Sequence, residues 1–223
     1  MKKSLLIFYL IIAIGFNLKA QVPTELATIT PLESKKQVQK NSNKLYFLVR
    51  ESFPLEKKGR KFLTNDFIKS TIIDFENEQF DVELRYRFLD DEMQMMHQGK
   101  IKAIFPQKVN KLIFTTNETK QIFIPTEYSD KKTINLGYFE LLAEGDMKLL
   151  KQFQKSGKEK IKTVLFFQNK SEPAKRFKVK KSSILKLMSK HKSSVSKFIV
   201  KNKLNVKNED DLKKVFEYYN SLP

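Results

Sequence analysis

The chain has no cysteine and only six glycines among its 223 residues. Without cysteine there is no disulfide, no thiolate metal site, no cysteine nucleophile and no bacterial lipid anchor, which requires a cysteine directly after the signal peptide. With so few glycines, a glycine-rich loop that binds phosphate is not expected. The sequence also contains neither the nucleophile-elbow motif of serine hydrolases nor a histidine spacing typical of zinc sites. We therefore expect a fold held by packing alone, without cofactors.

Arginine is also scarce, although the chain is strongly basic. The net charge is +18, yet only five of the 43 basic residues are arginine. The excess is local, because residues 21–147 carry 19 basic and 19 acidic residues, whereas residues 148–203 carry 18 basic residues and only two acidic ones. Forked recognition of phosphate favours arginine, so this lysine-rich segment indicates either general attraction to an anionic partner or simply a solvated, lysine-decorated surface.

The first 20 residues have the pattern of a secretory signal peptide. Two lysines precede an apolar block, Leu5 to Phe16, and a small residue, Ala20, stands at the expected cleavage point. The block is shorter than the roughly 20 apolar residues that a membrane span needs. We expect cleavage after Ala20, export to the periplasm or the cell surface, and no transmembrane span in the mature chain.

The strongest structural pattern runs from Phe80 to Phe88. Apolar residues at the even positions alternate with charged residues at the odd positions, which predicts a strand with one buried face and one solvated face. Arg85 and Arg87 should project from the solvated face beside Asp81 and Glu83, in cross-strand ion pairs.

Further strands are expected on both sides of this one, joined by short turns. Before it, we expect either a buried strand or a docked arm at residues 45–49, and a strand at 71–76. After it, strands are expected at 94–97, 101–105, 111–115, 121–125, 138–142, 147–153, 164–167 and 177–179.

From about residue 182 the apolar spacing changes to three and four, which predicts short helices. We expect one capped by Ser182 or Ser183 and ending at Met188, a second over roughly 193–203, and a third capped by Asn208.

The predicted fold class is α+β: a mainly antiparallel β meander or partial barrel followed by two or three short C-terminal helices. The expected organisation is a signal peptide (1–20), a mostly irregular lead-in (21–61), an antiparallel β domain (62–181) and a C-terminal helical segment (182–223).

Several segments resemble an uncharacterised family of exported proteins from Bacteroidota. The similar stretches are Leu84 to Met93, Gly137 to Leu142, and the ending that contains Asp210-Asp211-Leu212 and Tyr218-Tyr219-Asn220. The family often has Asn where this chain has Arg87. The resemblance implies an exported bacterial protein, but no activity and no site residues.

Three groups of residues are candidate sites. The first is an anion-binding set in the lysine-rich segment: Lys178, Lys180, Lys181, Lys186, Lys190 and Lys192. The second is a copper site in which Met93, Met95 and His97 would share one strand face; packing of the methionines in the core is the competing interpretation. The third is the carboxylate run Asp90, Asp91 and Glu92, which could serve acid–base chemistry or simply form a turn in which Asp90 bonds backbone and the other two face water.

The sequence therefore favours an exported, soluble, non-enzymatic protein with a binding or structural role. Its possible partner is an anionic envelope surface or a polysaccharide, and nucleic acid is not expected because no recognition motif is present. Two alternatives stay open: a carboxylate-dependent hydrolase, and a carrier that holds an apolar ligand among the phenylalanines.

Overall fold

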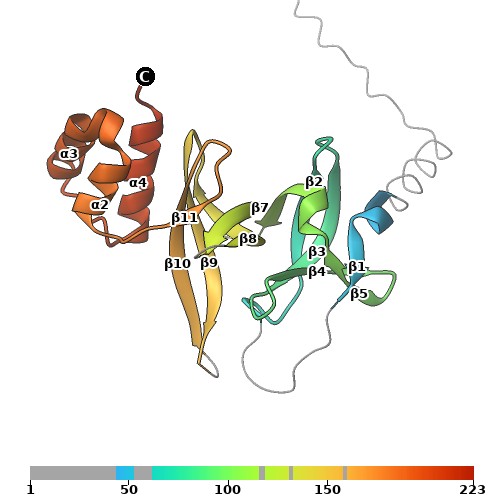
Figure 1. Cartoon of the computed structure of the whole chain (residues 1–223). Helices are drawn as coiled ribbons and strands as arrows, with labels where there is room; N and C mark the ends of the chain where they lie inside the picture. Colours follow the sequence, from blue (N-terminus) through green and yellow to red (C-terminus); the bar gives the residue numbers. More distant parts are fainter. Residues whose placement is uncertain (1–43, 53–61, 116–118, 131–132, 158–159) are drawn as a thin grey trace, which may run out of the picture. The chain divides into compact units, whose positions relative to one another are not determined.

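The computed structural model describes residues 44–52, 62–115, 119–130, 133–157 and 160–223. The expected signal peptide and most of the expected lead-in lie outside these residues. Within them the chain is a mainly antiparallel, open sheet that is followed by three short helices at the C-terminus, as expected (Figure 1). The strands are β1 (Val49–Glu51), β2 (Ile68–Asp74), β3 (Gln79–Arg87), β4 (Glu92–His97), β5 (Lys100–Ile104), β6 (Val109–Thr115), β7 (Lys120–Asp130), β8 (Thr133–Ala143), β9 (Met147–Ser156), β10 (Lys160–Asn169) and β11 (Lys175–Arg176).

The strands are ordered β1-β5-β4-β3-β2-β6-β7-β8-β9-β10-β11, so most neighbours in space are also neighbours in sequence. Hairpins explain this order, because antiparallel strands can be joined by very short turns. The last strand also returns toward β7: the Ser129 N–H donates to the Ala174 carbonyl at 2.9 Å, and the Ala174 N–H donates to the Glu127 carbonyl at 2.7 Å. The end of the sheet from β7 to β11 therefore curls around its own apolar side chains.

The predicted central strand is confirmed as β3, and its alternation holds over most of its length. Phe80, Leu84 and Tyr86 are buried, and Asp81 and Glu83 are exposed. The alternation fails at its end, because Arg87 is only 1% exposed and pairs across the strands with Glu92 instead of with Asp81 or Glu83. The prediction of a solvated Arg87 was wrong.

Two other strands do not lie where they were predicted, and one of them is the buried-strand alternative for residues 45–49. Residues 44–47 are helical, and the strand begins only at Val49, where β5 offers a partner. The helical turn is held by Lys44, whose Nζ lies 3.1 Å from Asp74 and 2.8 Å from Glu78. At the other end, residues 177–179 form no strand, since β11 is only Lys175–Arg176.

The C-terminal helices are α2 (Lys181–Leu187), α3 (Lys192–Lys201) and α4 (Glu209–Asn220); Ser189–His191 forms the short 3₁₀ helix η2, and Pro106–Lys108 forms η1. The cap of α4 is confirmed, because Asn208 accepts a hydrogen bond from the Asp211 N–H at 3.0 Å. The cap of α2 was mispredicted: Lys180 stands at that position and makes no side-chain capping bond. Figure 1 shows the three helices packed against one another.

Three apolar clusters hold these elements together. The first lies among β1–β6 and includes Phe123, Tyr138 and Phe153 from the following strands. The second joins the helices to β8, β9 and β10, through residues such as Leu149 and Phe216. The third is the interior of the curled end, and the rings of Tyr128, Phe139 and Phe166 meet there at centroid distances of 5.1–5.9 Å. Each cluster is filled by side chains in mutual contact, as packed interiors are.

Candidate functional site

The three consecutive carboxylates point into three different surroundings. Asp90 is exposed and lies 2.9 Å from the Arg87 guanidinium. Glu92 is fully buried, where it contacts Arg87 at 3.0 Å and Arg50 at 3.1 Å. Asp91 turns the other way, onto β8. The turn interpretation is correct for the backbone, but the expectation that Asp91 and Glu92 face water was wrong. No pair of these carboxylates converges as acid–base catalysis would need.

Glu92 is the centre of a buried polar network at the end of β3 and β4. Its Oε1 accepts hydrogen bonds from Ser52 Oγ at 2.7 Å and from Gln94 Nε2 at 2.9 Å. Gln94 in turn accepts a bond from Arg85 Nε at 2.9 Å, and the Arg85 guanidinium lies 4.0 Å from the centroid of the Phe62 ring. A buried charge is tolerated only where it is paired and hydrogen-bonded, and Glu92 meets both conditions. These bonds therefore stabilise the strand ends that border the first apolar cluster.

Asp91 has the most perturbed environment of the three. Its Oδ1 accepts a bond from the Tyr86 hydroxyl at 2.5 Å, and both carboxylate oxygens lie within 3.2 Å of the Tyr138 backbone N–H. Burial raises the pKa of the Asp91 carboxyl from 3.8 to about 6, although the hydrogen bonds that it accepts act in the opposite direction. Burial also raises the pKa of the Tyr86 hydroxyl well above its usual value.

Gly137 is the strand residue that makes room for this carboxylate. A Cβ at that position would lie 2.4 Å from Asp91 Oδ2 and 3.0 Å from Tyr128 Cε1. The backbone of Asp91 itself is left-handed, with φ 51°, which aims the side chain out of the β3–β4 turn and onto β8. The close contact between Asp91 and Gly137 therefore joins the β3–β4 hairpin to β8.

The methionine group is part of the core. Met93 and Met95 are 0% and 1% exposed and pack in the first cluster, while His97 is partly exposed at the following turn. The core-packing interpretation of the two methionines is confirmed. Among the described residues, no three His, Cys, Asp or Glu side chains are grouped as a metal site would require.

A buried ion cluster, which the sequence analysis missed, joins β8, β9 and α4. Lys151 Nζ lies 2.9 Å from Glu140 Oε2 and 2.7 Å from Glu209 Oε1, and the Lys151 and Glu140 side chains are only 11% and 10% exposed. Burial tends to lower the pKa of Lys151, but its bonds to Glu209 and Glu140 outweigh that effect and raise it. Lys151 therefore stays charged, so it cannot act as an amine nucleophile at neutral pH.

This cluster lies between two apolar patches on the same sheet face. Leu149, Lys151 and Phe153 alternate along β9, and Leu149 belongs to the second apolar cluster while Phe153 belongs to the first. A pocket of about 370 Å³ opens beside it. The signal in the sequence was a charged residue at an apolar position of a strand, both at Lys151 and at Glu140.

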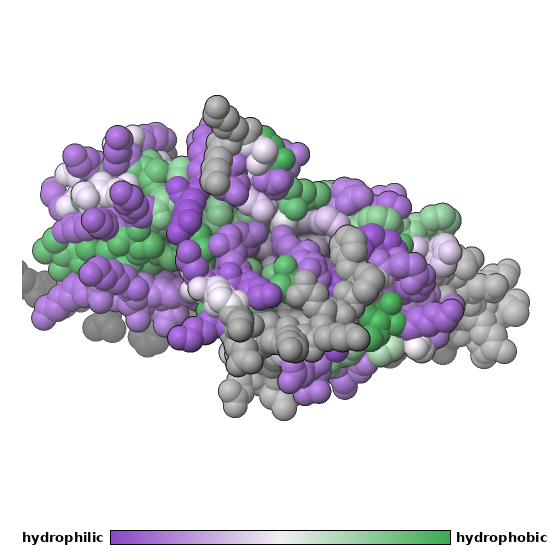
Figure 2. All heavy atoms as spheres, turned by 60° about the horizontal axis from the view of Figure 1, so that its bottom comes forward, coloured by the Kyte–Doolittle hydropathy of each residue, from purple (hydrophilic) through white to green (hydrophobic). Residues whose placement is uncertain are grey.

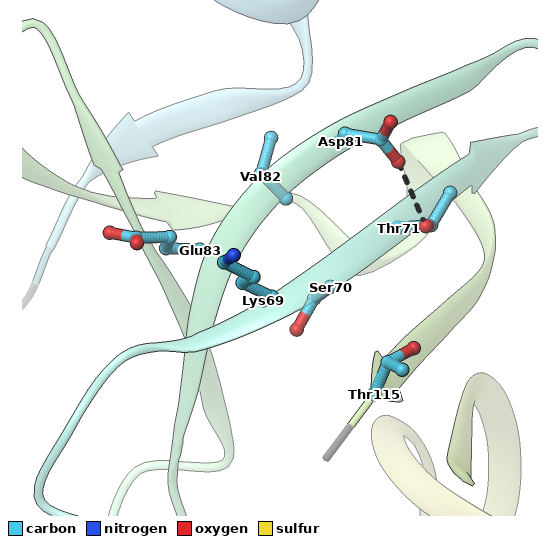
Figure 3. A pocket seen from close by; sticks show the side chains of 7 residues that line it. All are labelled: Lys69, Ser70, Thr71, Asp81, Val82, Glu83 and Thr115. Atoms are coloured by element: carbon cyan, nitrogen blue, oxygen red, sulfur yellow. Dashed lines mark hydrogen bonds between the residues drawn. The ribbon is translucent and has the colours of Figure 1, made fainter. Parts of the chain in front are cut away.

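A second hollow lies over the polar face of β2 and β3 and is open to solvent. Figure 3 shows Thr71 bonded to Asp81, and Lys69 and Glu83 beside each other on neighbouring strands. The Thr71 hydroxyl donates to Asp81 Oδ1 at 3.0 Å. These are ordinary cross-strand partners, so the hollow offers no chemistry beyond that of a solvated sheet face.

The six lysines singled out from the sequence all lie exposed in or beside the first two C-terminal helices. They belong to a stretch, residues 173–208, that holds 12 basic residues and no acidic one. Apart from Lys175, which pairs with Glu172 at 2.9 Å, none of these basic residues forms an ion pair within the described part of the chain. We call the exposed lysines of residues 178–203 the lysine surface: Lys178, Lys180, Lys181, Lys186, Lys190, Lys192, Lys197, Lys201 and Lys203.

Helix α4 differs sharply from this surface. Its exposed face carries Glu209, Asp210 and Glu217 beside Lys213 and Lys214, so its charges are mixed. In Figure 2 the helical part, at the left of the view, shows hydrophilic residues on both sides of a strip of hydrophobic ones. Val200 on α3, which is 64% exposed, is a large apolar residue at the surface of this part. Within the described helical part, the unbalanced positive charge thus lies on α2, η2, α3 and the residues next to them, and not on α4.

Comparison with known proteins identified no relationship: no family model, no curated protein and no solved structure matched the chain. Within the described residues there is also no helix that is both long and apolar enough to span a bilayer.

Proposed function

We propose that this is an exported, non-enzymatic bacterial protein that docks on an anionic lipid surface through its lysine surface. The observation that carries the proposal is the asymmetry of the helical part: α2, η2 and α3 expose lysines that form no ion pair with any described residue, whereas α4 exposes both signs of charge. A juxtamembrane lysine contributes about 1 kcal/mol near an anionic leaflet, so several together give useful affinity.

A lipid surface fits these residues better than an acidic polysaccharide does. Val200, which is 64% exposed, lies on α3 between Lys197 and Lys201 in the sequence. Apolar residues bordered by lysine suit the boundary between headgroups and acyl chains, where the apolar groups enter and the ammonium groups stay at the phosphates. A polysaccharide chain offers no such apolar layer.

Export to the periplasm or the cell surface, and membership of the Bacteroidota family, are parts of the same proposal. They depend on the pattern of the first 20 residues and on the resemblance of the three quoted segments. An exported protein that stays at the envelope needs a means of attachment, and the lysine surface would provide one.

The test is co-sedimentation of the purified protein with vesicles of phosphatidylcholine, with or without phosphatidylglycerol, at low and high salt. We expect binding only to the anionic vesicles, and loss of that binding at high salt, because exposed charges are screened. A variant with four lysines changed to Gln should bind at least about tenfold more weakly. The four are Lys178, Lys180, Lys181 and Lys186.

The matched control changes four exposed lysines outside the helices to Gln: Lys100, Lys120, Lys160 and Lys162. It removes the same charge and should bind almost as the unchanged protein does. If both variants lose affinity equally, net charge alone is responsible and the docking surface is wrong. Binding to an acidic polysaccharide with none to anionic vesicles would also refute the lipid assignment.

A further inference from the structure

A pocket of about 630 Å³ lies at the junction of α2, η2 and α3. Three lysines line it, Lys190, Lys192 and Lys197, and the buried Leu185 belongs to its wall. None of the described residues that line it is acidic. The lysines come from two successive elements, so the sharp connection between η2 and α3 brings together charges that a single straight helix would spread around its circumference.

Serine hydroxyls supply the remaining polar groups of the pocket. Ser189, Ser193 and Ser194 line it, and within the described part of the chain their hydroxyls make no side-chain hydrogen bond. These hydroxyls are therefore available to a ligand. Lys190 is anchored, because its Nζ donates to the Pro223 carbonyl at 3.0 Å, but an ammonium has two further N–H donors to offer.

We propose that this pocket binds the phosphate monoester of a lipid headgroup, and this inference rests on the proposed docking of the lysine surface. A phosphate monoester presents three terminal oxygens and close to two negative charges, which matches a set of ammonium and hydroxyl donors. A phosphodiester has only two terminal oxygens and one charge. The pocket is larger than a phosphate group, so it leaves room for the adjoining glycerol or sugar atoms.

The pocket adds selectivity that the rest of the lysine surface lacks. The affinity that exposed lysines provide depends on the charge density of the membrane surface, whichever lipid carries the charge. The affinity of a pocket in which hydroxyl and ammonium groups converge depends instead on how many phosphate oxygens a single headgroup offers. Lys178, Lys180, Lys181 and Lys186 lie outside the pocket, so general attraction and monoester recognition can be removed separately.

The experiment compares vesicles that contain phosphatidic acid, a monoester, with vesicles that contain phosphatidylglycerol, a diester, at matched surface potential. We expect the protein to bind the phosphatidic acid vesicles about tenfold more tightly, as one additional hydrogen bond to a charged group would imply. The double variant Ser193→Ala/Ser194→Ala keeps every charge and should lose this preference while its binding to phosphatidylglycerol is unchanged. Ser171→Ala/Ser182→Ala, at exposed serines outside the pocket, is the control and should keep the preference.

Equal affinity of the unchanged protein for the two lipids overturns the monoester pocket but leaves the docking surface standing. Failure to bind either lipid overturns both. A titration with glycerol 3-phosphate and with inorganic phosphate, followed by amide chemical shifts of Ser193 and Ser194, separates the sources of phosphate. Shifts that saturate with inorganic phosphate at equal affinity, without any preference between the vesicles, would refute the lipid headgroup.

Discussion

Replacing Asp91 with Asn should remove a pH-dependent contribution to stability. The Asp91 carboxyl has a folded-state pKa of about 6 in place of 3.8. Because the carboxyl has a higher pKa in the folded protein than in the unfolded chain, its protonation stabilises the folded state. This contribution to the free energy of unfolding is full below about pH 4 and is lost as the pH rises through about 6. A shift of this size corresponds to about 3 kcal/mol.

The assay is urea unfolding of both proteins at a series of pH values between 4 and 7.5, roughly the span over which the carboxyl titrates in the folded and unfolded states. The Asn side chain is neutral at every pH, so the stability of this variant relative to the unchanged protein should rise by about 2–2.5 kcal/mol across this range. The main cause is burial under β8, where the carboxylate receives bonds from Tyr86 and Tyr138 but still loses its water.

Asp66→Asn serves as the matched control, because Asp66 is exposed in the loop before β2. Its pH profile should run parallel to that of the unchanged protein. Parallel profiles for the Asp91 variant as well would refute the reasoning. Carboxyl carbon chemical shifts provide a direct check, since they should report a titration of Asp91 near pH 6.

Two further substitutions test the contacts that join the parts of the sheet and the helices. Gly137→Ala should lower the free energy of unfolding, measured with urea, by about 1–3 kcal/mol, since the added Cβ would lie 2.4 Å from Asp91 Oδ2. The control is Gly99→Ala, at a turn glycine with φ +72° and open space around it, which should lower it by only about 1 kcal/mol. Lys151→Met should cost about 3 kcal/mol because it leaves Glu140 buried without its cation, and the double variant Lys151→Met/Glu140→Leu should recover most of this loss. If the double variant is as unstable as the single one, the cost comes from packing and not from the stranded charge.

Local patterns in the sequence were sufficient for the strands, the turns and one helix. The alternation from Phe80 to Tyr86 fixes β3 because successive side chains of a strand point to opposite faces. Asn208 and the apolar spacing after it predict α4, since both the cap and the stripe are short-range features. The concentration of lysine in residues 148–203 is likewise visible without a structure.

Tertiary structure decided which polar residues are buried. The alternation in β3 predicts that Arg87 lies on the solvated face. In the structure Arg87 is buried, where it pairs with Glu92, and Arg50 from β1 pairs with the same carboxylate. Asp91 is partly buried because Gly137, 46 positions later, allows a close approach. Neither burial can be read from neighbours in sequence, because it depends on what packs across the face.

The sequence by itself thus determined a run of antiparallel strands, a helical ending and a local excess of positive charge, because each of these follows from side chains a few positions apart. Only the tertiary structure decided that Lys151 joins the sheet to α4, that Asp91 is withdrawn from water, and that three lysines and several serines converge between α2 and α3. Those arrangements depend on the directions in which separate elements meet, and chain spacing does not encode these directions.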